Sequence, residues 1–283
     1  MMIVGNTTTG DLGIYACPVC KRLLRQQDSA LICVPCSQTF PIKEGIPDFL
    51  LEELSRSADP ELRRMRFIDR MAGIYESKLW YPLVLNLYGG LRSPSLTQLI
   101  ATVTQKVQSA NGRVLDIACG PGTYGRRIAS PSKEVFGIDV SLGMLRQGAV
   151  YIAAEGNPHM HFARARVEAL PFGDGLFDAA LCCGSLHLFT DTVIALREMA
   201  RVMMPAAILS VFTFGVGDGG LLKFRRGREW SRRQGLHAFE LSEMERYLTA
   251  SGFTDFQPEV AGSILTFSAR RVAARLTSQE RIV

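Results

Sequence analysis

The sequence predicts an α/β fold, a seven-stranded mixed sheet between helices, preceded by a small cysteine-rich unit. Residues 113–125, RVLDIACGPGTYG, join a short apolar run to a glycine-rich turn, a pattern typical of a buried parallel strand and the tight turn after it. Residues 134–140, EVFGIDV, form a second apolar run that contains an aspartate near its end. Residues 15–50 contain two C-x2-C pairs, a spacing typical of metal sites.

Length and composition allow one sizeable core with a small accessory unit. The chain has 283 residues, and 47% of them are hydrophobic, which is enough for a large sheet and a second, smaller element. No apolar run approaches the roughly 18 to 20 residues of a membrane span, and the first residues lack a basic region followed by a long apolar one. We therefore expect a cytoplasmic protein with no membrane span. The formal charge of +5 permits an acidic partner but does not require one.

The two cysteine pairs predict a structural zinc site. Cys17 and Cys20 form the first pair, and Cys33 and Cys36 form the second after twelve intervening residues. Four thiolates close a tetrahedral zinc site and leave no position for water, so the metal would stabilise the local fold. The alternatives are two disulfides or four unligated thiols.

The strand and turn at residues 113–125 predict a pocket for a nucleotide-like cofactor. Residues 120–122 make the turn, and residues 123–130 are apolar enough to begin a helix, so backbone amides would face a ligand at the end of the strand. Asp116 lies four residues before the first glycine, where its carboxylate would oppose a pyrophosphate but can pair with an ammonium group. Asp139 ends the next strand and can accept hydrogen bonds from both hydroxyls of a ribose. An adenosine with an ammonium group and no pyrophosphate is S-adenosylmethionine. A glycine turn that only packs a helix on a sheet is the alternative.

Around this turn the chain resembles the class I S-adenosylmethionine-dependent methyltransferases. The similarity continues through VEALPF (167–172), FDAALCCGSLHLFTD (177–191) and REMARVMMP (197–205), and it covers about residues 60 to 270. It implies a Rossmann-like sheet and methyl transfer from S-adenosylmethionine. Residues 15–50 resemble the Trm112-like zinc ribbons and the amino-terminal zinc finger of the 23S ribosomal RNA guanine-N1 methyltransferases. The order of ribbon and methyltransferase is similar to that of uncharacterised methyltransferases of cyanobacteria and plastids.

The resemblance implies a zinc ribbon at residues 1–50, a polar linker at 51–60 and a methyltransferase domain at 61–283. In related enzymes an amphipathic helix such as residues 61–74 covers the cofactor. Tyr75, which follows it, is a candidate catalytic residue at the methyl-transfer site or a packing residue. Residues 80–90, WYPLVLNLYGG, either wall a lipophilic substrate pocket or belong to the core.

The resemblance also assigns cofactor contacts to the carboxyl ends of the strands. Asp116 and the glycine turn would hold the methionine end of the cofactor, and Asp139 would hold the ribose. The full expected set is Asp116, Ala118, Gly120, Gly122, Asp139, Val140, Met144, Val167, Glu168 and Cys183. Many relatives hold the adenine amino group with an aspartate, where this chain has Arg166. Either Glu168, a neighbouring backbone group or another residue binds the adenine, or the affinity for the cofactor is reduced.

The residues after the strand expected at 177–184 should meet the methyl acceptor. His187 is a candidate catalytic residue, because an imidazole can accept a proton near neutral pH if the acceptor is a hydroxyl or an amine. The alternative is a histidine that lines or supports the pocket. Cys182 and Cys183 are interpreted as small core residues rather than nucleophiles.

Local patterns towards the carboxyl terminus predict a turn, a helix cap and an edge hairpin. Ala206 and Ala207 stand where relatives have a glycine pair, so the turn there should avoid a positive φ. Ser242 and Glu245 predict a capping box for a helix that ends at Ala250. The last two strand-like runs, FTDFQPEV and SILTFSARR, predict an antiparallel hairpin at the edge of the sheet.

Residues 223–233, KFRRGREWSRR, form a basic segment with six cations and two interleaved aromatic residues. Such a segment can bind phosphates by charge and bases by stacking. It can equally be a solvated helix face whose arginine stems cover apolar surface, at the rim where small ligands enter sheets of this kind. We favour the second interpretation.

Three functions are compatible with the sequence. The first is methylation of a small, apolar or aromatic metabolite, favoured by residues 80–90. The second is methylation of a structured RNA base, favoured by the ribbon and the basic segment. The third is a cofactor-binding protein without turnover, for which Arg166 is the main support. The sequence specifies neither the acceptor atom, carbon, oxygen or nitrogen, nor the oligomeric state.

Overall fold

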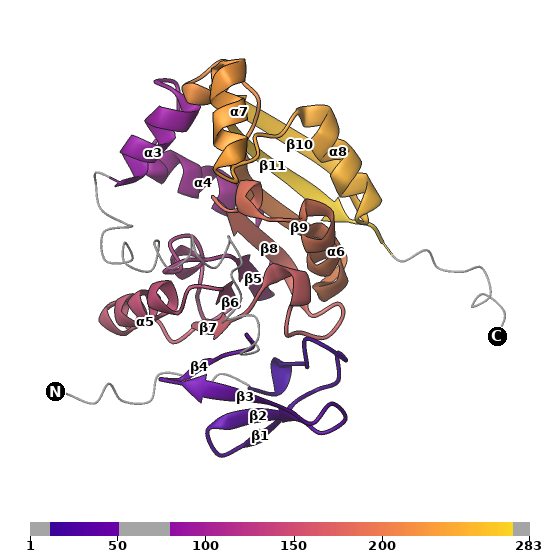
Figure 1. The fold of residues 1–283 in the computed structure, drawn as a ribbon. Helices are drawn as coiled ribbons and strands as arrows, with labels where there is room; N and C mark the ends of the chain where they lie inside the picture. The colour runs from indigo at the N-terminus through magenta and orange to yellow at the C-terminus, as the bar shows by residue number, and fades with distance from the viewer. Residues whose placement is uncertain (1–11, 51–79, 274–283) are drawn as a thin grey trace.

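Two sheets organise the part of the chain that the computed structural model describes, residues 12–50 and 80–273 (Figure 1). The expected linker at 51–60, the expected helix at 61–74 and the candidate residue Tyr75 lie outside these residues.

The larger sheet has seven strands in the order β10-β11-β9-β8-β5-β6-β7. They are β5 (Gly112–Ile117), β6 (Lys133–Asp139), β7 (Met160–Arg164), β8 (Phe177–Cys183), β9 (Met203–Phe214), β10 (Phe253–Ala261) and β11 (Ile264–Arg271). The four neighbouring pairs β9–β8, β8–β5, β5–β6 and β6–β7 are parallel, whereas β11 is antiparallel to both β9 and β10. The α/β fold, the mixed seven-stranded sheet and the edge hairpin expected from the sequence are confirmed.

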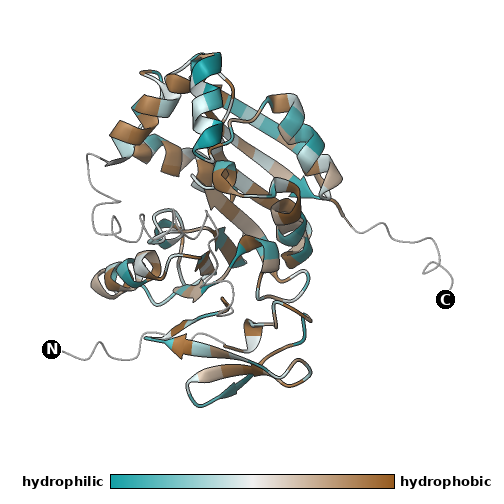
Figure 2. Cartoon of the chain, in the orientation of Figure 1, coloured by the Kyte–Doolittle hydropathy of each residue, from teal (hydrophilic) through white to brown (hydrophobic). Residues whose placement is uncertain are grey.

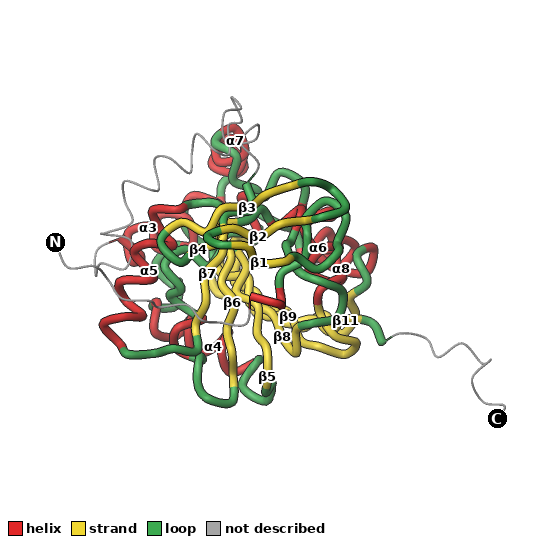
Figure 3. The backbone as a smooth tube through the Cα atoms, turned by 90° about the horizontal axis from the view of Figure 1, so that it is seen from below, coloured by secondary structure: helices red, strands yellow, loops and turns green. Residues whose placement is uncertain are grey.

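Helices cover both faces of this sheet (Figure 3). One face carries α3 (Trp80–Gly89), α4 (Leu96–Lys106) and α5 (Leu142–Glu155), and the other carries α6 (Thr192–Val202) and α8 (Leu241–Ala250). Val114 packs with the first group and its neighbour Leu115 with the second, because successive strand residues point to opposite faces. Burial on both faces explains why the strands have continuous apolar runs. The short helix α7 (Arg225–Arg233) projects from the body of the molecule.

The smaller sheet belongs to an amino-terminal unit, residues 12–50. Its antiparallel strands are β1 (Arg25–Gln27), β2 (Ala30–Cys33), β3 (Gln38–Lys43) and β4 (Ile46–Pro47). Tyr15 stacks on Phe172 with ring centroids 5.5 Å apart. The Phe49 amide donates to the carbonyl of Arg164, the last residue of β7, at 2.8 Å. The unit therefore shares one hydrophobic core with the larger sheet and covers its edge strand β7, which would otherwise be open to pairing.

The prediction of a helix at residues 123–130 is wrong, because only a short 3-10 turn, η3 (Gly125–Arg127), forms there. Three residues of the preceding turn have positive φ, so the chain is still changing direction when it reaches residue 122. Ser130 then pairs with Lys133 in an isolated bridge, so too few residues remain for an α-helix.

Two predictions near the carboxyl terminus are also wrong. Ala206 has a φ of 64°, although the turn was expected to avoid a positive φ. It lies at a register shift between β8 and β9, where the extra residues of one strand must depart from extended geometry. Ser242 does not cap α8, because the helix begins at Leu241. Its N-cap residue is Glu240, whose side chain makes no capping bond.

Candidate active site

The glycine turn after β5 lies against the end of β6. Ala118, Gly120 and Gly122 have φ values of 51°, 55° and 77°, a left-handed conformation that is unstrained for glycine and strained for alanine. The Cys119 amide donates to the carbonyl of Ile138 at 3.0 Å. The turn therefore holds three of the expected cofactor residues together at the carboxyl edge of the sheet.

Asp139 ties the end of β6 to this turn. One of its buried carboxylate oxygens accepts from the Gly120 amide at 2.9 Å, and the other accepts from the Ser141 amide at 2.8 Å. A carboxylate can accept about four hydrogen bonds. These two bonds orient the group at the end of β6.

Asp116 lies in the core beneath the turn. It is 1% exposed, and its Oδ2 accepts from the Gly125 amide at 2.9 Å. Burial raises the pKa of the Asp116 carboxyl to about 7; the Gly125 amide opposes this rise and the charge of Asp139 adds to it. A cation bound beside this carboxyl would favour its ionised form.

Val140 and Met144 continue the site into the start of α5. The Met144 amide donates to Ser141 Oγ at 3.0 Å, so Ser141 caps α5. The Val140 carbonyl accepts from Nε of Arg164 at 2.9 Å. This bond joins the loop after β6 to the end of β7.

Val167 and Glu168 lie in η4 (Val167–Ala169), just after β7. Oε2 of Glu168 accepts from Nε of Arg166 at 3.3 Å. Oε1 of Glu168 is buried, and no donor among the described residues reaches it. Buried acceptors are nearly always hydrogen bonded, so this oxygen is suited to a donor from a ligand.

His187 lies in η5 (Leu186–Leu188), directly after β8, and is buried. Its Nδ1 is 3.2 Å from Thr213 Oγ1, and its backbone carbonyl accepts from the His237 amide at 2.8 Å. Burial lowers the pKa of the His187 imidazole to about 3. The neutral imidazole is therefore the stable form and a weak base, which favours the supporting role over the general-base role. Burial also raises the pKa of the Cys183 thiol well above its usual value, so this residue is a protonated core thiol and not a nucleophile.

An aromatic cluster that includes His187 lies at the ends of β8 and β9. Its ring lies edge-on to Phe214 with centroids 4.6 Å apart, and Phe214 contacts Phe212 at 6.0 Å and Tyr88 of α3 at 5.4 Å. The segment at 80–90 thus forms a helix that packs one face on the core through residues such as Leu85 and brings Tyr88 to the strand ends.

The partners of His187 could not be found from local sequence patterns. Thr213 lies 26 residues further along the chain, next to the last residue of what reads as an ordinary apolar strand. Only the parallel pairing of β8 with β9 brings the two residues together. Tyr88 was part of a segment for which core and pocket were both possible.

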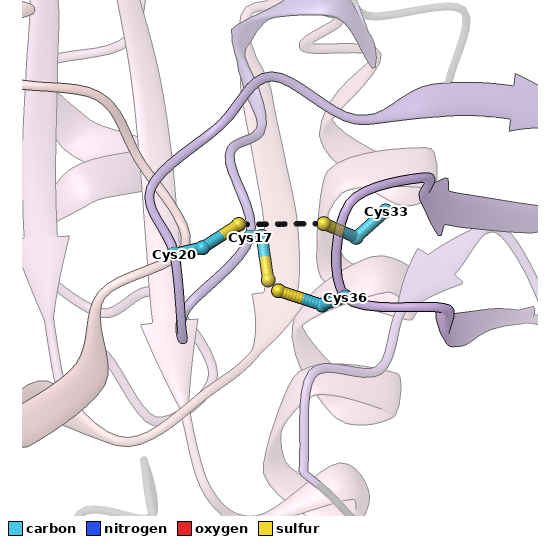
Figure 4. Close-up of side chains that lie close together, drawn as sticks. All are labelled: Cys17, Cys20, Cys33 and Cys36. Carbon is cyan, nitrogen blue, oxygen red and sulfur yellow. Dashed lines mark hydrogen bonds between the residues drawn. The ribbon is translucent and has the colours of Figure 1, made fainter.

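The four cysteines of the amino-terminal unit converge from the two turns that flank β1 and β2 (Figure 4). Their sulfur atoms all lie within 4.8 Å of one another, with Cys20 and Cys33 3.4 Å apart. None of them forms a disulfide. Four thiolates at about 2.3 Å from a zinc ion have sulfurs about 3.8 Å apart in a tetrahedron. The donor set and its spacing fit such an ion.

The basic segment forms the end of η6 (Leu221–Lys223) and helix α7, which is teal in Figure 2. Phe224 and Trp230 are exposed, whereas two arginines of α7 face α8. There they line a cavity of about 310 Å³, together with a third arginine, a histidine and two glutamates. These lining residues are Arg228, Arg232, Arg246, His237, Glu240 and Glu243. The segment therefore presents cations both to the surface and to a small cavity.

Comparisons with known proteins agree with this geometry. A model of a methyltransferase domain matches residues 114–206. The uncharacterized chloroplastic methyltransferase At2g41040 of Arabidopsis thaliana is 25% identical over 91% of this chain and 78% of its own length. The ubiquinone/menaquinone biosynthesis C-methyltransferase UbiE of Hahella chejuensis is 36% identical over 40% of this chain, and the match spans about half (47%) of that enzyme.

Solved structures show the same fold. Phosphoethanolamine N-methyltransferase 2 of Haemonchus contortus, in complex with phosphomonomethylethanolamine and S-adenosylhomocysteine, superposes with a TM-score of 0.61 at 18% identity. The match covers 77% of this chain and 61% of that protein.

In the described residues no helix is long and apolar enough to cross a membrane.

Proposed function

We propose that this chain, which its fold, its family match and its relatives identify as an S-adenosylmethionine-dependent methyltransferase, methylates a small apolar or aromatic acceptor. The observation that carries the proposal is the aromatic group of His187, Phe212, Phe214 and Tyr88 at the ends of β8 and β9. In open α/β sheets ligands bind outside the carboxyl ends of the strands, and aromatic rings favour flat apolar ligands there. The quinone C-methyltransferase among the relatives supports the same class of acceptor.

The cofactor would lie across the ends of β5, β6 and β7. In this proposal Asp116 and the glycine turn hold the methionine end, and Asp139 accepts the ribose hydroxyls. The buried Oε1 of Glu168 would accept from the adenine amino group. Arg166 then acts by orienting Glu168 through its bond to Oε2, which supplies a role for the residue that departs from the family pattern.

Methyl transfer in such a site depends on alignment more than on proton transfer. S-adenosylmethionine, when bound, would supply an electrophilic methyl group, and the residues of the site would align the acceptor atom with it. Holding the two reactants in line can supply about 7 to 11 kcal/mol of the barrier. His187, with its lowered pKa, would support the acceptor wall, and the acceptor's proton, where it has one to lose, would pass to water.

A structural zinc ion is proposed for the amino-terminal unit, with Cys17, Cys20, Cys33 and Cys36 as ligands. The mutual spacing of the sulfurs supports it. Zinc bound by four thiolates has no free coordination position. It would therefore stabilise the unit and take no part in methyl transfer.

The test of the proposed function is a labelled-methyl transfer assay against separate lipid, small-molecule and RNA fractions of the native host. We expect label from S-adenosylmethionine in the lipid or small-molecule fraction, and in a hydroxylated naphthoquinone used as a defined probe. Asp139→Ala should abolish the labelling by removing the proposed ribose acceptor. Label that enters only RNA would contradict the proposal.

Methylation of a structured RNA base is the second candidate. Exposed arginines on α7 with Phe224 and Trp230 beside them support it, because bases stack on exposed rings and phosphates bind guanidinium groups. The apolar surroundings of His187 favour the first candidate.

A further inference from the structure

A buried carboxylate links the amino-terminal unit to the proposed cofactor site. Asp48, just after β4, is 2% exposed. Its Oδ2 accepts from Nζ of Lys43 at 2.8 Å and from Nη1 of Arg164 at 3.3 Å, and its Oδ1 accepts from the Leu50 amide at 3.2 Å. Three donors on a buried carboxylate fix its position, since charge-assisted hydrogen bonds in a low dielectric are strong.

Arg164 connects Asp48 to the carboxyl ends of the strands. It is the last residue of β7, and its Nε donates to the Val140 carbonyl at 2.9 Å. Val140 directly follows Asp139, and the Asp139 carbonyl accepts from the Ala165 amide at 3.1 Å. One guanidinium group therefore holds the loop beside the proposed ribose carboxylate with one nitrogen and the buried Asp48 with another.

We propose that Asp48 and Arg164 are positioning residues for S-adenosylmethionine, so that the amino-terminal unit forms a supporting wall of the cofactor site. This inference rests on the proposed function. Without Asp48, the Arg164 side chain loses its buried anion and is free to turn away from the Val140 carbonyl. The loop that carries Asp139 and Val140 then loses one of its anchors, the bond to the Val140 carbonyl. Cofactor binding has to order this part of the loop, which lowers the affinity.

The same contacts link metal binding to cofactor binding. The Asp48 amide donates to the carbonyl of Pro41 on β3, and Lys43 ends the same strand. β3 begins two residues after Cys36. A zinc ion that orders the cysteine turns therefore orders the strand that positions Asp48. By linkage, S-adenosylhomocysteine should also raise the affinity of the amino-terminal unit for zinc.

The test compares Asp48→Asn with Glu44→Gln as a matched control. Glu44 pairs with Arg146 at 2.6 Å across the same interface, but both side chains are exposed. We expect Asp48→Asn to weaken S-adenosylhomocysteine binding by roughly tenfold or more, measured by titration calorimetry, and to raise KM for S-adenosylmethionine with little change in kcat. Glu44→Gln should bind like the wild type.

Arg164→Gln tests the connection from the other side and leaves the amino-terminal unit unchanged. We expect the same weakening, and a double variant that is no worse than either single one, because the two residues act through one contact. Zinc content, measured by native mass spectrometry, should stay at one per chain in every variant. Wild-type affinity in both single variants with zinc retained would overturn the inference alone. A wild-type chain that binds no S-adenosylhomocysteine would overturn the proposed function as well.

Discussion

At the scale of single residues, His187 should make stability depend on pH. Its folded pKa of about 3 lies below the ordinary histidine pKa of 6.5, so the unfolded chain binds more protons between these values. Stability is then complete above pH 6.5 and falls as the pH decreases towards 3. Between pH 7 and pH 5 the loss from this residue should be about 2 kcal/mol.

His187→Gln checks this expectation, because glutamine cannot be protonated. Denaturant unfolding at pH 7 and pH 5 should show a smaller change in the free energy of unfolding in the variant than in the wild type. Asp116 titrates in the same window with the opposite sign, but it is present in both proteins and cancels in the comparison. An equal pH dependence of the two proteins would contradict the buried neutral imidazole.

Asp116 should release a proton when the cofactor binds. Its pKa of about 7 in the free protein leaves most of the carboxyl protonated at pH 6.5, whereas a bound ammonium group favours the carboxylate. We expect S-adenosylhomocysteine binding to release a large fraction of one proton at pH 6.5, measured by calorimetry in buffers of different ionisation enthalpy. Adenosine, which lacks the ammonium group, should release none. Proton release that persists in Asp116→Asn would contradict the assignment.

The predictability of the site also differs residue by residue. Asp116 and Asp139 could be predicted because each follows an apolar run, and parallel strands end at a common edge. Asp48 and Arg164 could not, because 116 residues separate them and neither belongs to a local pattern. Glu168 was one of several candidates, and only the unpaired Oε1 distinguishes it.

At the scale of elements, strands and long helices followed from periodicity, whereas short connections did not. The apolar positions at 123–130 suggested a helix, but the left-handed residues of the turn before it left only η3. The positive φ of Ala206 was missed because it depends on the register of β9 against β8, which is a property of two strands and not of one local sequence.

The basic segment on α7 should not bind RNA tightly. Arg225 is 82% exposed in its side chain and pairs with Glu229 within the helix, as a solvated helix face would. If the segment gripped phosphates, Arg225→Ala with Arg226→Ala would lower the slope of log affinity against log salt by about two. We expect no nanomolar affinity for structured RNA at physiological salt, measured by fluorescence anisotropy.

Arg270→Ala provides the control for this experiment. It removes an exposed cation that does not belong to α7 but lies on β11, where Arg270 pairs with Ile208 of β9. Salt-sensitive nanomolar binding that is lost in the double α7 variant and kept in Arg270→Ala would favour the RNA function. The cavity between α7 and α8 leads to a different expectation for Arg232→Ala: a higher acceptor KM with little salt dependence.

At the scale of the whole molecule, the sequence suggests a zinc ribbon followed by a linker, whereas in the structure the amino-terminal unit shares one core with the larger sheet. Tyr15 and Phe49 pack together and with Phe172 in one core with the larger sheet. Unfolding the unit alone would expose the edge of that core to water. Each Å² of apolar surface exposed in this way costs about 25 cal/mol of stability. The amino-terminal unit and the sheet should therefore behave as one cooperative structure.

We therefore expect removal of the metal to lower the melting temperature of the full chain in a single transition. Zinc binding stabilises the native state by mass action, and the shared core transmits this stabilisation to the larger sheet. Scanning calorimetry with and without a chelator, with zinc measured in the same samples, checks the expectation, and added zinc should restore the original melting temperature. The stabilisation by S-adenosylhomocysteine should shrink in the stripped protein, because Asp48 no longer holds Arg164. Two separate transitions, with the upper one and its response to S-adenosylhomocysteine unchanged by the chelator, would show that the shared core does not couple the two parts.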